Sequence, residues 1–259
     1  MVDRHQSITE AIVGADGPAI CAYVTAGFPT LERFPETLLS VARAADVVEV
    51  GVPFTDPMAD GLTIQHASHL ALENGVNLEW ILGTLAESSA ALQAPILLMG
   101  YYNPFLAYGL ARLGKALADA GVSGLIVPDL PYDESEDLRG SLDPFGIALV
   151  QLVTPSTPDD RLARLTAASG GFVYAVTTTG VTGGQTDFDQ ASLEYLARVR
   201  GISPLPVLAG FGIREAHQVK ALAPHVPGVV VGSALIDAIE RNEDPGVFID
   251  GLRFEEVPA

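Results

Sequence analysis

Glu49 and Asp60 are the two carboxylates whose place in the sequence best suits acid–base chemistry. Glu49 interrupts the apolar run Val47–Val52. If this run is a strand covered by helices, an outward Glu49 would bury an unpaired charge, which is costly, so we expect it to face inward. Burial among valines should raise its pKa toward neutrality, as a general acid or base requires. The alternative is a structural carboxylate paired with a buried donor.

A stiff loop follows this strand, from Pro53 to Gly61, and it carries Asp56 and Asp60. Loops held this rigidly at a strand end are often functional, although either aspartate could instead form a turn or cap a helix. As a pair, Glu49 and Asp60 suggest a division of work. One carboxyl group moves a proton, and the other stabilises a developing positive charge.

Glycine-rich segments occur at three later positions, in the ranges 180–184, 210–212 and 232–233. Glycine lets backbone amides approach an anion closely, and Ser233 adds a hydroxyl. The chain has only two lysines and a net charge of −18, so we expect a phosphate held by amides rather than by basic side chains.

Other polar residues are less decisive. Tyr174 is in phase with Phe172 and Val176, and it is either a core aromatic or a hydroxyl that faces a substrate. His66 and His69 lie three apart on a predicted helix without further ligands, so we expect a solvated helix face and no metal site.

Eight short apolar runs are typical of buried parallel strands. They are Ile20–Thr25, Val47–Val52, Ile96–Gly100, Gly124–Pro128, Ile147–Val153, Phe172–Thr177, Pro206–Gly210 and Gly228–Gly232. Helical patterns lie between them, at Leu31–Ala44, Leu78–Leu92, Phe105–Ala120, Asp159–Ala168, Gln190–Arg198 and Arg214–Leu222.

This alternation predicts an α/β protein, a single (β/α)8 TIM barrel spanning residues 1–259. An open doubly wound sheet would normally show a glycine fingerprint after its first strand, and none is present here. A short extra helix before Ile20 is expected to close the bottom of the barrel. The polar residues above then gather at the carboxyl ends of the strands.

Composition excludes several classes of function. The acidic charge argues against nucleic-acid binding, and no apolar run approaches the length of a membrane span. Cys21 is the only cysteine, which rules out an internal disulfide and suits a reducing cytoplasm.

Taken together, these segments resemble the α subunit of tryptophan synthase along nearly the whole chain. The most specific match is Val48–Gly61, and the segments Gly100–Pro104, Pro128–Pro131, Thr179–Gly183 and Gly210–Ile213 follow at the family's spacings. One departure is Leu62, which stands where the family commonly has proline.

The resemblance implies retro-aldol cleavage of indole-3-glycerol phosphate to indole and glyceraldehyde 3-phosphate. By matching position, Glu49 would protonate the ring carbon that bears the glycerol chain, Asp60 would hold the indole N–H, and Tyr174 would support the site. The phosphate would sit on Gly183, Phe211, Gly212, Gly232 and Ser233, and Tyr23 and Leu98 would be walls of the indole pocket.

The resemblance also implies a partner, the tryptophan synthase β subunit, in an αββα heterotetramer. Asp56, Pro57, Asn103 and Pro104 would lie at that contact. Pyridoxal phosphate would belong to the β subunit, so we expect no cofactor in this chain.

Three rival functions remain. The nearest is a free-standing indole-3-glycerol-phosphate lyase that is active without a partner. The second is another phosphate-binding barrel, such as a sugar-phosphate isomerase, with its carboxylates elsewhere. The third is a barrel kept as a non-catalytic scaffold, which the presence of both Glu49 and Asp60 argues against.

Overall fold

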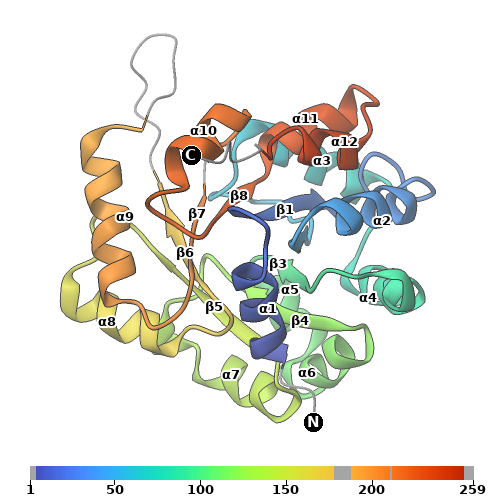
Figure 1. Cartoon of the computed structure of the whole chain (residues 1–259). Helices are drawn as coiled ribbons and strands as arrows, with labels where there is room; N and C mark the ends of the chain where they lie inside the picture. Colours follow the sequence, from blue (N-terminus) through green and yellow to red (C-terminus); the bar gives the residue numbers. More distant parts are fainter. Residues whose placement is uncertain (1–3, 178–187, 211, 254–259) are drawn as a thin grey trace.

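Eight parallel strands close into a barrel in sequence order, which confirms the predicted architecture (Figure 1). The computed structural model describes residues 4–177, 188–210 and 212–253. The strands are β1 Ala19–Thr25, β2 Val47–Gly51, β3 Ile96–Met99, β4 Val122–Ile126, β5 Ala148–Val153, β6 Val173–Val176, β7 Val207–Gly210 and β8 Gly228–Val231. All eight coincide with the predicted apolar runs to within two residues at each end.

Helices surround this ring of strands in the described part of the chain (Figure 1). They are α1 Arg4–Val13, α2 Phe34–Ala44, α3 Leu62–Glu73, α4 Leu78–Ser88, α5 Tyr102–Tyr108, α6 Leu110–Asp119, α7 Glu136–Leu142, α8 Asp159–Ala168, α9 Gln190–Ile202, α10 Ala216–Leu222, α11 Ser233–Glu240 and α12 Pro245–Asp250. Short 3-10 turns lie at η1 Ser89–Ala91, η2 Tyr132–Glu134 and η3 Asp143–Phe145.

Local sequence signals explain several helix boundaries. The Asn77 side chain accepts a hydrogen bond of 2.9 Å from the Trp80 amide and so caps α4. The predicted helix Phe105–Ala120 is wrong as a single element. It is divided into α5 and α6 at Gly109, whose φ of 102° cannot continue a helix.

A second boundary, at the start of α10, matters for the site. The helix begins at Ala216 rather than at the predicted Arg214, because Glu215 is its N-cap. Gln218 completes a capping box there, with its Oε1 accepting from the Glu215 amide at 3.0 Å. Arg214 is thereby left in the loop that follows β7.

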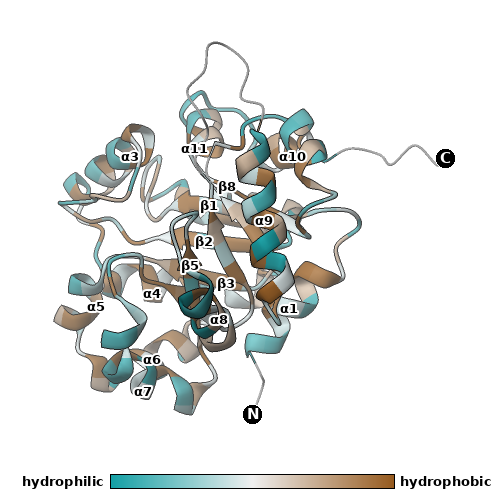
Figure 2. Ribbon diagram, turned by 90° about the vertical axis from the view of Figure 1, so that its left-hand side faces the viewer, coloured by the Kyte–Doolittle hydropathy of each residue, from teal (hydrophilic) through white to brown (hydrophobic). Residues whose placement is uncertain are grey.

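The core has two layers, one inside the barrel and one between strands and helices. Figure 2 shows hydrophobic residues concentrated on the strands, with hydrophilic residues on the outer helices. Side chains alternate between these layers along each strand, so Cys21, Leu97 and Leu208 fill the interior.

The N-terminal helix α1 closes the bottom of the barrel, as predicted. Its Ile8 and Ile12 are buried in the interior cluster. Thr9 Oγ1 donates a hydrogen bond of 2.7 Å to the Gly171 carbonyl, and Ile8 packs where a Cβ at Gly171 would stand. No helix in the described ranges is long and apolar enough to cross a bilayer.

Candidate active site

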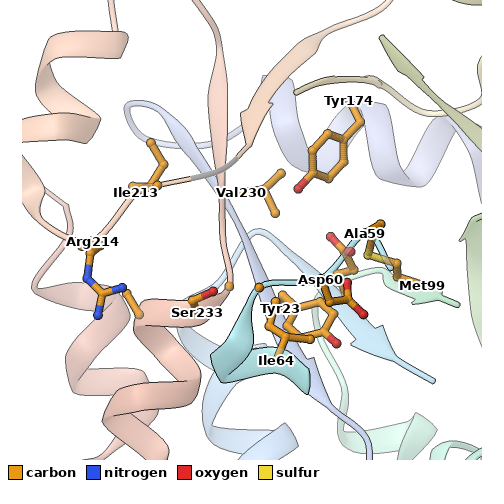
Figure 3. Close-up of a pocket in the computed structure, with 15 residues that line it drawn as sticks. Tyr23, Ala59, Asp60, Ile64, Met99, Tyr174, Ile213, Arg214, Val230 and Ser233 are labelled. Carbon is orange, nitrogen blue, oxygen red and sulfur yellow. The ribbon is translucent and has the colours of Figure 1, made fainter. Parts of the chain in front are cut away.

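A cavity of about 390 Å³ opens at the carboxyl ends of the strands (Figure 3). This is the catalytic face of a (β/α)8 barrel, and the volume is within the range of small-molecule sites. The lining residues are Tyr23, Glu49, Ala59, Asp60, Gly61, Ile64, Met99, Tyr174, Gly212, Ile213, Arg214, Val230, Gly232, Ser233 and Ala234.

Glu49 faces into this cavity from β2, as expected, and is only 1% exposed. In the register of the sheet it lies between Tyr23 on β1 and Leu97 on β3. Below it, the Cys21 thiol lies 4.0 Å from Glu49 Oε2. Burial, and secondarily the negative charge of Asp60, raises the pKa of Glu49 to about 8. The group is therefore largely protonated at neutral pH, as a general acid must be.

Asp60 lies on the same cavity wall at the end of the Pro53–Gly61 loop. Burial raises the pKa of Asp60 to about 6, while a hydrogen bond from Tyr101 opposes this shift. The Tyr101 hydroxyl also accepts a hydrogen bond of 2.7 Å from the Ala59 amide, and its ring stacks on Phe54 at 5.0 Å between centroids. Tyr101 thus fixes both ends of the loop that carries Asp60.

Two tyrosines reach the cavity because glycines leave room for their rings. A Cβ on Gly51 would stand 2.0 Å from the Tyr23 hydroxyl, and one on Gly210 would stand 2.4 Å from the Tyr174 hydroxyl. Tyr174 therefore projects inward and lines the cavity (Figure 3). Burial and the negative charges nearby raise the pKa of both tyrosines, so both stay neutral hydroxyls.

The opposite end of the cavity suits an anion. Gly212 follows β7, Gly232 follows β8, and Ser233 begins α11 at the cavity wall, where the free amides of a helix N-terminus favour an anion. Gln218 Nε2 donates to the Gly212 carbonyl at 3.0 Å and holds this turn. Three of the predicted phosphate residues, Gly212, Gly232 and Ser233, line the same cavity. The other two, Gly183 and Phe211, and the Thr179–Gly184 loop lie outside the described residues.

One predicted wall residue is wrong. Leu98 belongs to the layer between strands and helices and does not line the cavity, because alternation along β3 turns it away from the interior. Its neighbour Met99 lines the cavity instead. Glu49 pairs with Leu97 in the sheet, so Leu97 faces the interior and Leu98 faces the helices. Strand register of this kind cannot be read from the sequence alone.

The residues missed by sequence reasoning include Ile64, Tyr101 and Arg214. Tyr101 belongs to the Gly100–Pro104 segment that matches the family, but only its contacts with Ala59 and Asp60 show its role in the site. Arg214 was assigned to a helix, and only its place in the loop after β7 brings it to the cavity.

The four residues expected to meet a partner lie at the rim of the same barrel face. Asp56 and Asn103 are exposed, and Pro57 and Pro104 are half-buried. Loop and helix are adjacent, since Tyr101 contacts Ala59 and immediately precedes α5. Two large apolar side chains are nearly fully exposed on this loop and at the start of α3, Met58 at 94% and Leu62 at 84%.

His66 and His69 lie on the exposed face of α3, as predicted. His66 pairs with Glu240 and His69 with Glu73, each at 3.3 Å. Within the described ranges, no group of three or more histidine, cysteine or acidic side chains could hold a metal ion. Leu62 occupies the first position of α3, a position where proline is favoured, and the helix begins there with leucine.

Fold and site together define a (β/α)8 barrel enzyme with a carboxylate pair facing a glycine- and serine-lined anion site. A family model for the tryptophan synthase alpha chain matches residues 11–248. The chain belongs to this family, whose members are lyases that cleave indole-3-glycerol phosphate.

Individual relatives agree with this assignment. The tryptophan synthase alpha chain of Roseiflexus castenholzii is 45% identical over 237 residues, covering 89% of each chain. That of Nitratidesulfovibrio vulgaris is 44% identical, covering 91% of this chain and 92% of its own. A solved structure concerning the tryptophan synthase α2β2 complex of Pyrococcus furiosus superposes with a TM-score of 0.84 at 33% identity, covering 91% of this chain and 98% of that one.

Proposed function

We propose that this chain cleaves indole-3-glycerol phosphate to indole and glyceraldehyde 3-phosphate with Glu49 and Asp60 as its catalytic pair. The observation that carries the proposal is their common cavity, with Glu49 protonated at neutral pH and Asp60 largely ionised. The anion site lies across the same cavity, so one substrate can reach both ends. Other phosphate barrels would place their carboxylates elsewhere.

The chemistry requires the indole ring to become a leaving group. Glu49 delivers its proton to the ring carbon that carries the glycerol chain, and positive charge develops on the ring nitrogen. Asp60 accepts the indole N–H hydrogen bond and stabilises that charge. As the carbon–carbon bond breaks, its electron pair returns to the ring, a carbonyl forms, and the deprotonated Glu49 accepts the hydroxyl proton.

The remaining residues bind and orient the substrate. The phosphate is held by Gly183, Phe211, Gly212, Gly232 and Ser233. Tyr174 supports Glu49, and the walls around the indole ring are Tyr23 and Met99. None of these steps needs a metal or an organic cofactor, so the chain acts without either. Its single, buried cysteine and its biosynthetic family favour the cytoplasm.

The chain further works as the α subunit of an αββα heterotetramer, with Asp56, Pro57, Asn103 and Pro104 at the contact with the β subunit. Support comes from the exposed apolar side chains of Met58 and Leu62 beside these residues. Pyridoxal phosphate would be held by the β subunit, which consumes the indole.

The test is an indole-release assay on the wild type and on Glu49→Gln, each with and without the β subunit. Loss of the proton donor should lower turnover by about 10² to 10⁴-fold. Glu10→Gln is the matched control, since Glu10 lies on α1 at the other end of the barrel. Wild-type activity that survives in Glu49→Gln would refute the assignment, and wild-type activity unchanged by the β subunit would favour a free-standing lyase.

A further inference from the structure

Arg214 is the basic side chain at the anion end of the cavity. Building on the proposed function, we propose that its guanidinium binds the substrate phosphate, in addition to the backbone amides and Ser233. Composition had indicated a phosphate held by backbone amides without basic side chains, and Arg214 adds one basic side chain to that site.

Position is the first argument. Arg214 lines the same cavity as Gly212, Gly232 and Ser233. Figure 3 shows Arg214 and Ser233 on one side of this cavity, with Asp60 and Tyr23 on the other. A substrate with its ring at the carboxylates would therefore place its phosphate on the side of Arg214.

Charge is the second argument. Arg214 is the one basic side chain lining the cavity in the part of the chain that the structure describes. The acidic groups there are Asp60, largely ionised at neutral pH, and Glu49, largely protonated, and the whole chain carries a net charge of −18. This acidic field opposes the entry of a phosphate ester, and a cation at the anion end of the cavity offsets that repulsion. The planar fork of a guanidinium matches phosphate oxygens and can donate to two of them at once.

The Arg214 side chain is held by a neighbour and still has donors available for a ligand. Arg214 Nη2 forms an ion pair with Asp237 Oδ2 on α11, the helix that begins at Ser233. A guanidinium has five N–H donors, so it can keep this pair and still donate to a phosphate. The arginine side chain is 52% exposed, which leaves it accessible to a ligand from the cavity mouth.

The backbone under Arg214 is fixed as well. Its amide donates a hydrogen bond of 2.7 Å to Gln218 Oε1, and Gln218 is 1% exposed. Because the same glutamine side chain holds the Gly212 carbonyl, one buried residue fixes the backbone of both Gly212 and Arg214. Such preorganisation lowers the entropic cost of binding.

The test compares Arg214→Met with Arg241→Met. Arg241 follows the opposite end of α11, pairs with Glu243 and is 56% exposed, so its loss removes the same charge in a similar setting. We expect Arg214→Met to raise the KM for indole-3-glycerol phosphate about tenfold or more with kcat little changed, the pattern of lost ground-state binding. Inhibition by glyceraldehyde 3-phosphate should weaken by a similar factor, whereas inhibition by indole should not.

Arg214→Lys keeps the charge but loses the fork, so its KM should fall between those of Arg214→Met and the wild type. Equal KM values in Arg214→Met and Arg241→Met would overturn the proposal, as would weakened inhibition by indole to the same extent. Should the methionine variant not fold, the lysine variant decides: an unchanged KM for substrate overturns the proposal.

Failure of the wider assignment would look different. Binding of inorganic phosphate by the wild type, Arg214→Met and Arg241→Met, followed by calorimetry, needs no turnover. Weaker phosphate binding in Arg214→Met alone supports the anion site even if the wild type releases no indole. Equal phosphate binding in all three overturns the role of Arg214 and leaves the lyase activity standing.

Discussion

At the scale of single residues, the site depends on two carboxyl groups with different environments. Glu49 is buried inside the barrel, next to the Cys21 thiol and within reach of the negative charge of Asp60. Asp60 stands at the rim, where the Tyr101 hydroxyl stabilises its ionised form. Their pKa values therefore differ, about 8 for Glu49 and about 6 for Asp60. At neutral pH the cavity thus holds a proton donor, Glu49, and an anion, Asp60.

A bell-shaped pH dependence of kcat/KM follows from this separation. As pH rises through about 8, Glu49 loses the proton it must donate, and activity falls. As pH falls through about 6, Asp60 becomes neutral and no longer stabilises positive charge on the ring. Indole release measured between these limits should be maximal near neutrality, and a profile that keeps rising above pH 9 would contradict the role of Glu49.

Tyr101→Phe should move one side of this profile. The Tyr101 hydroxyl lowers the pKa of Asp60, so its removal raises that pKa and shifts the acidic limb toward higher pH. The basic limb, which belongs to Glu49, should stay near pH 8. The Phe54 stacking survives in this variant, so a loss of activity with an unmoved acidic limb would mean that the hydroxyl acts only on the Ala59 amide.

At the scale of elements, strand ends and the loops after them deliver the chemistry. β2 supplies Glu49, its loop supplies Asp60, and the loops after β7 and β8 supply the anion site. Glycines on β2 and β7 are as important as the functional side chains, because Tyr23 and Tyr174 occupy the volume that a larger residue would fill.

Gly210→Ala should disturb the site through Tyr174. The added Cβ would stand 2.4 Å from the tyrosine ring, so the ring must move or the strand must shift, at a cost of about 1–3 kcal/mol. Chemical denaturation and lyase kinetics should both report the damage. Gly83→Ala in α4, where nothing lies within 4 Å, is the control and should be neutral or slightly stabilising.

A double-mutant cycle with Tyr174→Leu sharpens this test. If the clash is with the Tyr174 ring, the second change should recover part of the stability lost in Gly210→Ala, and the two effects should not add. Simple additivity of the two free energies of unfolding would place the strain elsewhere on β7.

At the scale of the whole molecule, the barrel separates its two ends. Helix α1 seals the bottom with Ile8 and Ile12, while the cavity and the exposed apolar side chains gather at the mouth. An exposed apolar patch beside a catalytic loop offers a surface for a partner, and binding there can act directly on the loop that holds Asp60.

Met58→Glu should weaken assembly with the β subunit. Met58 is 94% exposed on the Pro53–Gly61 loop, and a charge at an apolar contact is poorly tolerated. We expect about a tenfold weaker Kd in analytical ultracentrifugation or calorimetry. Val13→Glu at the barrel bottom, where the valine is 69% exposed, is the control, and an equal loss in both variants would reflect net charge alone.

Patterns in the amino-acid sequence predicted the barrel, its strands and most of the residues that the structure places in the cavity. Apolar runs of strand length mark every strand because parallel strands are buried on both faces. An unpaired outward charge within such a run is costly, which favoured an inward Glu49. Glycines and Ser233 after the last strands indicated the anion site, because glycine exposes backbone amides and serine adds a hydroxyl. Helix boundaries near Gly109 and Glu215 were less predictable, since they depend on a backbone angle and a cap.

Other features of the site follow from strand register and from contacts between distant segments. Met99 rather than Leu98 lines the pocket because sheet pairing fixes the phase of β3. Tyr101 reaches Asp60 across 41 positions of sequence because the loop after β2 lies beside the end of β3. Arg214 faces the anion site because Gln218 and Asp237 hold it there. Such contacts join residues far apart in the chain, so only the closed barrel brings them together.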